Sequence, residues 1–432
     1  MNTYLNFALI IILALGLNIF AHKFLNQRWN LWLVYGICGL VMVLFMWNNT
    51  IGYGQDFTKA YYPAGSLIIQ NPFRMYYTYQ GEACRGFVNI PIIAFLFTPF
   101  SLINKSTSLL IFTILGWAIF IANLFFLIKI AQLAELQIKT LAGLFLINGP
   151  FYYSLKVGNT THFVLFIFIL ALYLIQRKRD IWGGVFLAIA ALIKVPLLLL
   201  GVYFIIRGRR RVIIGFGTSI IAVVGASLLF FGFNLHLAWY RECIAPFANK
   251  PIGAFNVQSV NGFLARLLLK SELNSWQLIE VGWDFKVVRY LILCLLIGGT
   301  TLICWRCKTP TTIEVENLEF SIVLCLTILT SPISWTHYYL LLLLPLSLYL
   351  GNKLAVPKGR VWFILIGVSA LLMSPPVIRF KDEVFFQTFL LPRLLISHYF
   401  LGGIILIGVL LAARWHASKN FASLNLEGQI KN

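Results

Sequence analysis

Long apolar runs recur along almost the whole chain, and short polar stretches separate them. Runs such as 213–233 and 287–305 are each long enough to cross a hydrocarbon core of about 30 Å as a helix. The runs lack the strict alternation of a membrane barrel strand, so helices are predicted. The pattern indicates an all-α polytopic membrane protein, a single domain over residues 1–432, with roughly 11–13 transmembrane or re-entrant helices.

The remaining apolar runs complete the predicted bundle. They are 5–21, 31–47, 109–128, 141–153, the run that starts at Gly158, 361–377 and 394–413. Between residues 88 and 153 the topology is consistent only if one segment is re-entrant, and the segment with Pro91 and Pro99 is the candidate.

Two apolar stretches are interrupted near their centres. Run 181–206 contains Lys194 followed by Val195 and Pro196, and SPISWTH (331–337) separates two runs that are each short for a crossing. Proline breaks a helix, so each stretch is predicted to form two half-helices that meet at an apex lining a cavity. Residues 314–319 and 353–360 are predicted to be polar loops that flank the second pair.

Charge is sparse and clustered. Charged residues make up 11% of the chain against 60% hydrophobic residues, and the net charge is +20. The basic residues gather in short loops at 176–180, 207–211 and 306–308. This is the pattern of cytoplasmic loops next to anionic membrane lipids, and it argues against nucleic acid as a partner.

With those loops inside, two longer loops lie on the extracytoplasmic side. They span 48–87 and 234–284 and contain Cys84 and Cys243, which leaves a disulfide between the loops open.

Asp56, one of four aspartates in the chain, stands in the first of these loops within GYGQDFTKAYYPAG. A carboxylate at the mouth of a helix bundle can act as a general base on a hydroxyl, or it can be a solvated interfacial residue. Lys59 and Tyr62 follow closely, and the aromatic residues of the loop could stack on a sugar or form an interface belt.

Lys194 is a second candidate, because an ammonium inside an apolar run needs a wet cavity or an anion such as phosphate, unless it snorkels to the interface. His337, at the end of SPISWTH, could bind an anion at a broken helix or could be a packing residue. His162, after Gly158-Asn159-Thr160-Thr161, is a candidate of the same kind.

The second outer loop brings together Asn256, Gln258 and Arg266 within FNVQSVNGFLARLL, either as ligand contacts or as polar caps of an interfacial helix. The sequence contains no Gly-rich phosphate loop, no closely spaced catalytic carboxylates and no HExxH motif. A nucleotide, another cofactor or a metal is therefore not expected.

Several of these segments together resemble glycosyltransferase family 87, a family of GT-C membrane enzymes similar to bacterial mannosyltransferases. The segments are DFTKAYYPAG with NPFRMYY, IPIIAFLFTPFSLI, the G-N-x-x-H start of the Gly158 run, ALIKVPLLLLGVYFIIRGRRR, NVQSVNGFLAR and SPISWTHYYLLLLLP. They follow one another in the family's order from about Gly52 to Pro345. The chain departs from the family in having Asn159 where Gln is usual after the glycine, and run 5–21 resembles an addition ahead of the common core.

The resemblance implies an inverting transfer of a mannose-like hexose or a pentose from a polyprenyl-phosphate donor to a lipid or glycan acceptor, at the outer face of a bacterial plasma membrane. Asp56 would be the catalytic base, with no metal and no cofactor. The donor-phosphate and substrate-binding residues would be Lys194, His337, Arg266, Lys59, Gln258, Asn256, His162 and Tyr62. The alternative is a transporter or flippase of lipid-linked glycans, in which Lys194 and His337 would line a path through the membrane.

Overall fold

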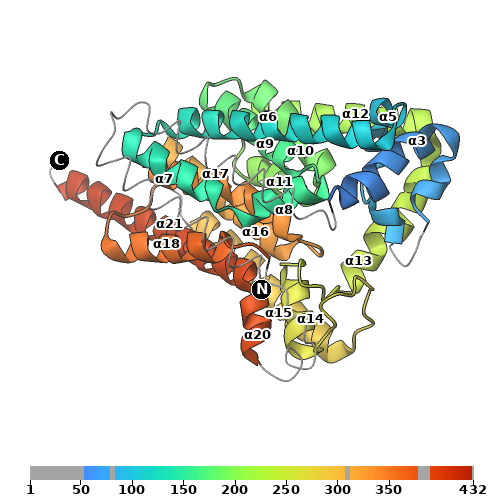
Figure 1. Ribbon diagram of the computed structural model, residues 1–432. Helices are drawn as coiled ribbons and strands as arrows, with labels where there is room; N and C mark the ends of the chain where they lie inside the picture. The colour runs from blue at the N-terminus through green and yellow to red at the C-terminus, as the bar shows by residue number, and fades with distance from the viewer. Residues whose placement is uncertain (1–52, 78–82, 307–311, 378–389, 431–432) are drawn as a thin grey trace, which may run out of the picture.

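The structure is a computed structural model of the chain (Figure 1). It describes residues 53–77, 83–306, 312–377 and 390–430. Within these residues the chain is almost entirely helical, which confirms the predicted all-α class. The predicted runs 5–21 and 31–47 lie outside the described residues.

The helical elements follow in chain order. They are η1 (Phe57–Tyr61), α3 (Tyr62–Gln70), η2 (Pro72–Met75), η3 (Ala83–Gly86), α4 (Pro91–Phe95), α5 (Thr98–Ser101), α6 (Lys105–Ala131), α7 (Glu135–Leu146), α8 (Gly149–Val157), α9 (Thr161–Gln176), α10 (Asp180–Ile193), η4 (Val195–Leu197), α11 (Leu198–Ile206), α12 (Arg210–Trp239), η5 (Tyr240–Ile244), α13 (Ala245–Asn249), α14 (Val260–Leu268), α15 (Trp283–Arg306), α16 (Ile313–Thr330), η6 (Thr336–Leu342), α17 (Leu343–Leu350), α18 (Arg360–Met373), α20 (Leu390–Ile396) and α21 (His398–Ile430).

Four helical stretches are long and apolar enough to cross a membrane. They are Lys105–Ala131, Arg210–Asn249, Trp283–Trp305 and His398–Ser418. In Figure 1, α6 and α12 run along one side of the bundle, α18 and α21 along the other, and α9, α10 and α16 lie between them. Large apolar side chains such as Leu229, Phe230 and Leu295 are exposed on α12 and α15, as expected of surfaces that face lipid.

Three shorter spans are broken into two pieces. Lys194 separates α10 from η4 and α11, and residues 331–335 separate α16 from η6 and α17, so both predicted interruptions are confirmed. The run 141–153, predicted as one helix, is instead divided at 147–148 between α7 and α8. The reason is local, since Asn148 caps α8 with its side chain and Pro150 stands in the first turn.

The bundle therefore has two distinct ends. The end where α8 stops, α9 begins and α10 breaks is called the Asp56 end below. The turns 176–180 and 207–210 lie at the other end of the same helices and define the basic end.

The prediction that residues 314–319 form a polar loop is wrong, because they are the first turns of α16. Glu319 is fully buried there and is neutralised by two arginines. Arg414 Nε donates to its Oε1 at 2.8 Å, and Arg207 binds both of its carboxylate oxygens. A carboxylate paired in this way can enter an apolar helix interface.

The proline segment predicted to be re-entrant forms the two short helices α4 and α5. Neither is long enough to span a bilayer. Both pack against α3, and the Thr98 hydroxyl donates to the carbonyl of Gly65 at 3.0 Å. The segment thus stays at the Asp56 end, between η1 and the start of α6.

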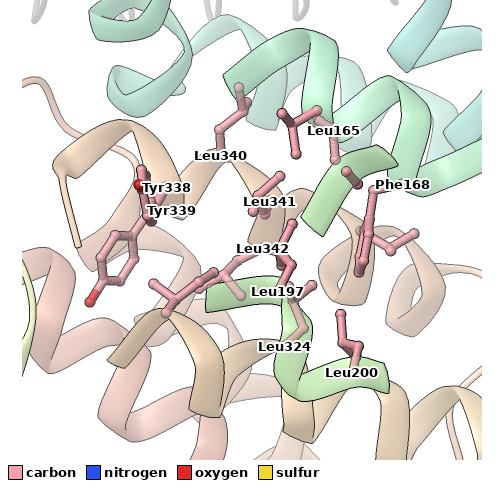
Figure 2. Packing of buried hydrophobic residues seen from close by; sticks show 14 of the residues in the cluster. Leu165, Phe168, Leu197, Leu200, Leu324, Tyr338, Tyr339, Leu340, Leu341 and Leu342 are labelled. Atoms are coloured by element: carbon pink, nitrogen blue, oxygen red, sulfur yellow. The ribbon is translucent and has the colours of Figure 1, made fainter. Parts of the chain in front are cut away.

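The core lies where the broken spans meet. Figure 2 shows Leu165 and Phe168 of α9 packed with Leu197, Leu324 and Leu340, which come from η4, α16 and η6. These side chains are at most 1% exposed. Packing of this density fixes the helix breaks relative to one another.

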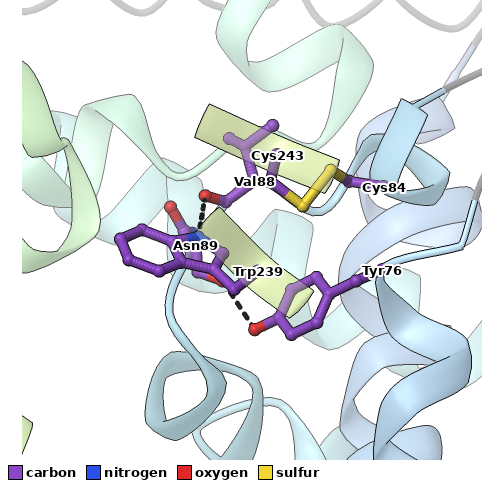
Figure 3. Close-up of a disulfide and its surroundings, with 6 residues drawn as sticks. All are labelled: Tyr76, Cys84, Val88, Asn89, Trp239 and Cys243. Carbon is purple, nitrogen blue, oxygen red and sulfur yellow. Dashed lines mark hydrogen bonds between the residues drawn. A yellow bond between two sulfur atoms is a disulfide. The ribbon is translucent and has the colours of Figure 1, made fainter. Parts of the chain in front are cut away.

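A disulfide joins Cys84 to Cys243, so the possibility left open by the sequence is realised. It ties η3 to η5 across a sequence separation of 159 residues. Figure 3 shows the bond and its surroundings. Two hydrogen bonds flank it: Trp239 Nε1 donates to the Val88 carbonyl at 2.9 Å, and the Tyr76 hydroxyl donates to the Asn89 carbonyl at 2.9 Å. Burial raises the pKa of Tyr76 above its usual value, so that this hydroxyl keeps its proton.

Candidate active site

Asp56 stands at the start of η1, just after a turn at Tyr53 and Gly54 that packs on the end of α8. The Gly54 N–H donates to the Lys156 carbonyl at 2.6 Å. Gly158 has φ +69°, and a Cβ placed on it would lie 2.8 Å from Phe57 Cβ. Only glycine allows this backbone conformation together with this close approach, so the contact fixes where Asp56 stands.

Asn159 connects Asp56 to Lys194. Its Nδ2 donates to Asp56 Oδ2 at 2.6 Å, and its Oδ1 accepts from Lys194 Nζ at 3.2 Å. Thr161 orients the amide, because its N–H and hydroxyl both donate to Oδ1, at 3.1 and 2.8 Å. The half-buried carboxylate of Asp56 and the buried ammonium of Lys194 are thus both hydrogen-bonded to the same uncharged amide.

Lys194 stands at the break between α10 and η4, where Pro196 follows. It is only 7% exposed, and its Nζ lies 4.6 Å from the centre of the Tyr338 ring. A cation over an aromatic face is stabilised without being neutralised. Lys194 therefore remains able to attract an anion.

Tyr61 forms the wall beside Asp56. Its ring stacks on Phe97 with centroids 4.7 Å apart, and its hydroxyl lies 3.4 Å from that of Thr160. Burial raises the pKa of Tyr61, and the charge of Asp56 raises it further. The hydroxyl is therefore a neutral hydrogen-bonding group next to the carboxylate.

His337 is buried in η6 and stacks on Tyr153 of α8, with ring centroids 6.2 Å apart and an interplanar angle of 17°. Neither ring nitrogen has a hydrogen-bond partner among the described residues. A buried polar group without a partner is costly, so these nitrogens are suited to a ligand.

Asn256 links the second outer loop to Tyr153, the ring on which His337 stacks. Its Nδ2 donates to the Tyr153 hydroxyl at 2.9 Å, and its Oδ1 accepts from Trp276 Nε1 at 3.0 Å. Its carbonyl accepts from the Thr336 N–H at 2.8 Å, beside the bridge between Val257 and Trp335. The amide nitrogen and the amide oxygen of Asn256 thus each hydrogen-bond to an aromatic side chain.

Gln258 and Arg266 lie behind the same loop. Gln258 Nε2 donates to the carbonyls of Phe255 and Ile396. Arg266 Nη1 donates to the carbonyls of Ala254 and Val257, at 2.9 and 2.7 Å. Burial lowers the pKa of Arg266 to about 9. In the described structure these contacts support the loop that carries Asn256.

Three predicted residues are less closely tied to Asp56. His162 is fully buried, and its Nδ1 lies 3.0 Å from the Ser154 hydroxyl. The Tyr62 hydroxyl donates to the Ile103 carbonyl at 2.9 Å, toward the start of α6. Lys59 is exposed on η1.

The sequence reasoning did not select Asn159, Tyr153 or Tyr338 as site residues. Asn159 follows Gly158 between two apolar runs, and a polar residue at such a position is the sequence feature that could have pointed to a site residue. The contact itself joins residues 103 positions apart, so only the tertiary structure reveals it. Among the described residues, no group of three His, Cys, Asp or Glu side chains could hold a metal ion.

The sequence model of glycosyltransferase family 87 matches residues 87–332, which is more than half of the 432-residue chain. The chain belongs to glycosyltransferase family 87. A comparison with curated proteins finds no match.

Family 87 is of GT-C type, so the chain is a membrane glycosyltransferase. The matched region contains Asn159, Lys194 and Asn256, whereas Asp56 and His337 lie on either side of it. In the folded chain Asp56 accepts a hydrogen bond from Asn159. His337 stacks on Tyr153, whose hydroxyl accepts a hydrogen bond from Asn256.

Proposed function

We propose that this family 87 member moves a sugar from a polyprenyl-phosphate donor to an acceptor hydroxyl, with inversion and with Asp56 as the base. The sugar would be a mannose-like hexose or a pentose, and the acceptor a lipid or a glycan. The observation that carries the proposal is the bridge from Asp56 through Asn159 to Lys194. It sets a carboxylate and a cation side by side without a direct ion pair between them.

The proposed reaction is a single displacement. The acceptor oxygen bonds to the anomeric carbon while the bond from that carbon to the phosphate oxygen breaks. The hydroxyl proton passes to Asp56, and the phosphate leaves with the bonding electrons. Because phosphate is already a good leaving group, one carboxylate is sufficient and no acid partner is needed.

Lys194 and His337 would stabilise the leaving phosphate. Lys194 supplies a positive charge in a buried setting, where such a charge acts strongly. Neither ring nitrogen of His337 has a partner in the described parts of the chain, and one of them can donate to a phosphate oxygen. Asn159 occupies the position between Asp56 and Lys194 and hydrogen-bonds to both, so the cation can attract the phosphate without being neutralised by the base.

The disulfide supports an extracytoplasmic position for the Asp56 end. Disulfides persist in oxidising compartments, and the Cys84–Cys243 bond ties the Asp56 loop to η5, which directly follows α12. The basic turns at the other end fit the cytoplasmic side. We therefore propose the outer face of a bacterial plasma membrane as the site of reaction.

The test is transfer of labelled sugar from synthetic polyprenyl-phosphate mannose to a membrane-lipid acceptor pool by the purified protein. Asp56→Asn keeps the shape of the side chain but removes its basicity, so we expect turnover to fall by at least about 100-fold. Asp284→Asn is the matched control, since Asp284 is exposed at the start of α15.

Equal transfer by the wild type and by Asp56→Asn would refute the role of Asp56. If neither protein transfers label from a panel of lipid-linked sugars while vesicle assays show flipping, the transporter alternative would replace the enzyme.

A further inference from the structure

A cavity of about 300 Å³ lies at the basic end, at the far end of α9 from Asn159. Its walls come from α9, α11 and α16 and from the turns at 176–178 and 207–209. Cavities of this size hold small ligands in many proteins. None of its lining residues belongs to the candidate active site.

The cavity has an apolar interior and a polar mouth. Leu172, Phe204 and Phe320 line it and are buried, whereas Lys178 is exposed and Arg209 is partly exposed. A ligand that fills it must therefore combine a hydrocarbon part with a polar group.

The charge at the mouth selects an anion. Arg209 pairs with Glu316 at 2.9 Å and lies 3.7 Å from Asp180, while Lys178 forms no ion pair within the described part of the chain. The three segments at this end, 177–180, 207–211 and 314–319, contain seven basic and four acidic residues. A positive surplus therefore remains for a bound group.

The backbone holds Lys178 at this mouth. The residue has φ +59°, in the left-handed region that a lysine adopts only against steric resistance. The Arg179 N–H closes the turn by donating to the Leu174 carbonyl at 2.9 Å. Glycine or asparagine would suit this position better, so a lysine here is consistent with a use for its ammonium.

The level of the cavity identifies the source of the anion. The cavity opens where α9 and α11 end and α10 and α12 begin, which is where apolar helices give way to basic turns. In a bilayer this is the level of the lipid head groups. We propose that the cavity binds an anionic phospholipid, with its phosphate at Lys178 and Arg209 and an acyl chain against Leu172, Phe204 and Phe320.

The test is the thermal unfolding midpoint of the purified full chain in a neutral detergent, titrated with phosphatidylglycerol. We expect a saturable rise that phosphatidylcholine and glycerol 3-phosphate do not produce at the same concentrations. Lys178→Gln should weaken the apparent affinity about fivefold, the contribution of one lysine near an anionic head group. Ile313→Trp should abolish the rise, because the exposed Ile313 lines the cavity and a larger ring would obstruct it while every charge is kept.

Arg211→Gln is the matched control, since Arg211 follows the turn at 207–209 and does not line the cavity. It should respond to phosphatidylglycerol as the wild type does. The proposal is overturned if Arg211→Gln loses as much affinity as Lys178→Gln, or if phosphatidylcholine or glycerol 3-phosphate raises the midpoint equally. None of these readouts depends on sugar transfer.

Discussion

At the scale of single residues, the candidate site depends on one neutral side chain between two charged ones. If Lys194 paired directly with Asp56, the carboxylate would be a weaker base and the ammonium would be less free to attract a phosphate. Asn159 hydrogen-bonds to both groups and carries no charge. The amide thus aligns the base and lowers its basicity less than a direct ion pair would.

Replacing Asn159 with Asp tests this account. The new carboxylate would stand against Asp56 in place of an amide that donates at 2.6 Å. Two carboxylates this close cannot both ionise easily, so one pKa rises. We expect the acidic limb of the kcat/KM profile to move up by about one pH unit or more, and activity near neutral pH to fall.

Asn159→Ala provides the comparison for that profile. It removes a hydrogen bond to the carboxylate without adding charge, so it should lower kcat and move the acidic limb up by less than the Asp variant does. An acidic limb that stays in place in the Asp variant would show that Asn159 does not act on the base.

At the scale of elements, the site is an assembly of helix breaks. The ends of α8, α10 and α16 meet at the Asp56 end, and each break places a polar residue or loop among apolar helices. Backbone that leaves a helix inside a membrane is tolerated where it lines a polar cavity. The break at Gly158 is the one most closely packed on the Asp56 turn.

Gly158→Ala should disturb that break by two routes. The side chain would be held at φ +69°, and its Cβ would meet Phe57. Together we expect a loss of about 2–4 kcal/mol in stability and a displaced Asp56. Thermal unfolding in detergent and the transfer assay would measure the two effects.

Gly208→Ala separates the conformational cost from the steric contact. Gly208 has φ +63°, but nothing lies within 4 Å of the added Cβ. It should therefore show only the conformational cost, about 1–2 kcal/mol, with activity retained. Equal losses in the two variants would mean that the contact with Phe57 is unimportant.

The helix class could be predicted from the sequence, and so could the interruptions at Lys194 and at 331–335, because Pro196 and the SPISWTH linker are local signals that end a helix. The break at 147–148 carries a similar signal in Pro150, but it lies within an apolar run long enough to be predicted as one helix. The contact of Asn159 with Asp56, 103 residues away, could not be predicted, and neither could the pairing of Glu319 with arginines 95 and 112 residues away. Such pairings depend on helix packing, which no local pattern encodes.

At the scale of the whole molecule, Glu319 joins α16 to α11 and α21 at the basic end. It is fully buried with Arg414, and Arg207 completes the pairing. Glu319→Leu would leave two arginines without their carboxylate, and we expect a loss of about 3–5 kcal/mol in stability. Glu135→Leu, which breaks the exposed pair with Lys139, should change stability by less than about 1 kcal/mol. Similar unfolding midpoints for the two variants would contradict this account.

The disulfide constrains the opposite end, and it also reports which side of the membrane that end faces. In native membranes the thiols of Cys84 and Cys243 should resist a maleimide gel-shift reagent in denaturant until a reductant is added, whereas Cys294, Cys304 and Cys325 should react at once. Cys243→Ser should lower stability by about 2–5 kcal/mol, because the bond closes a long loop. It should also expose the thiol of Cys84 without a reductant. Since α12 and η5 together run from the basic turn at Arg210 to Cys243, an oxidised pair would assign the Asp56 end to an oxidising compartment and the basic end to the cytoplasm. A reduced pair in native membranes would reverse that assignment and place the proposed transfer on the cytoplasmic side.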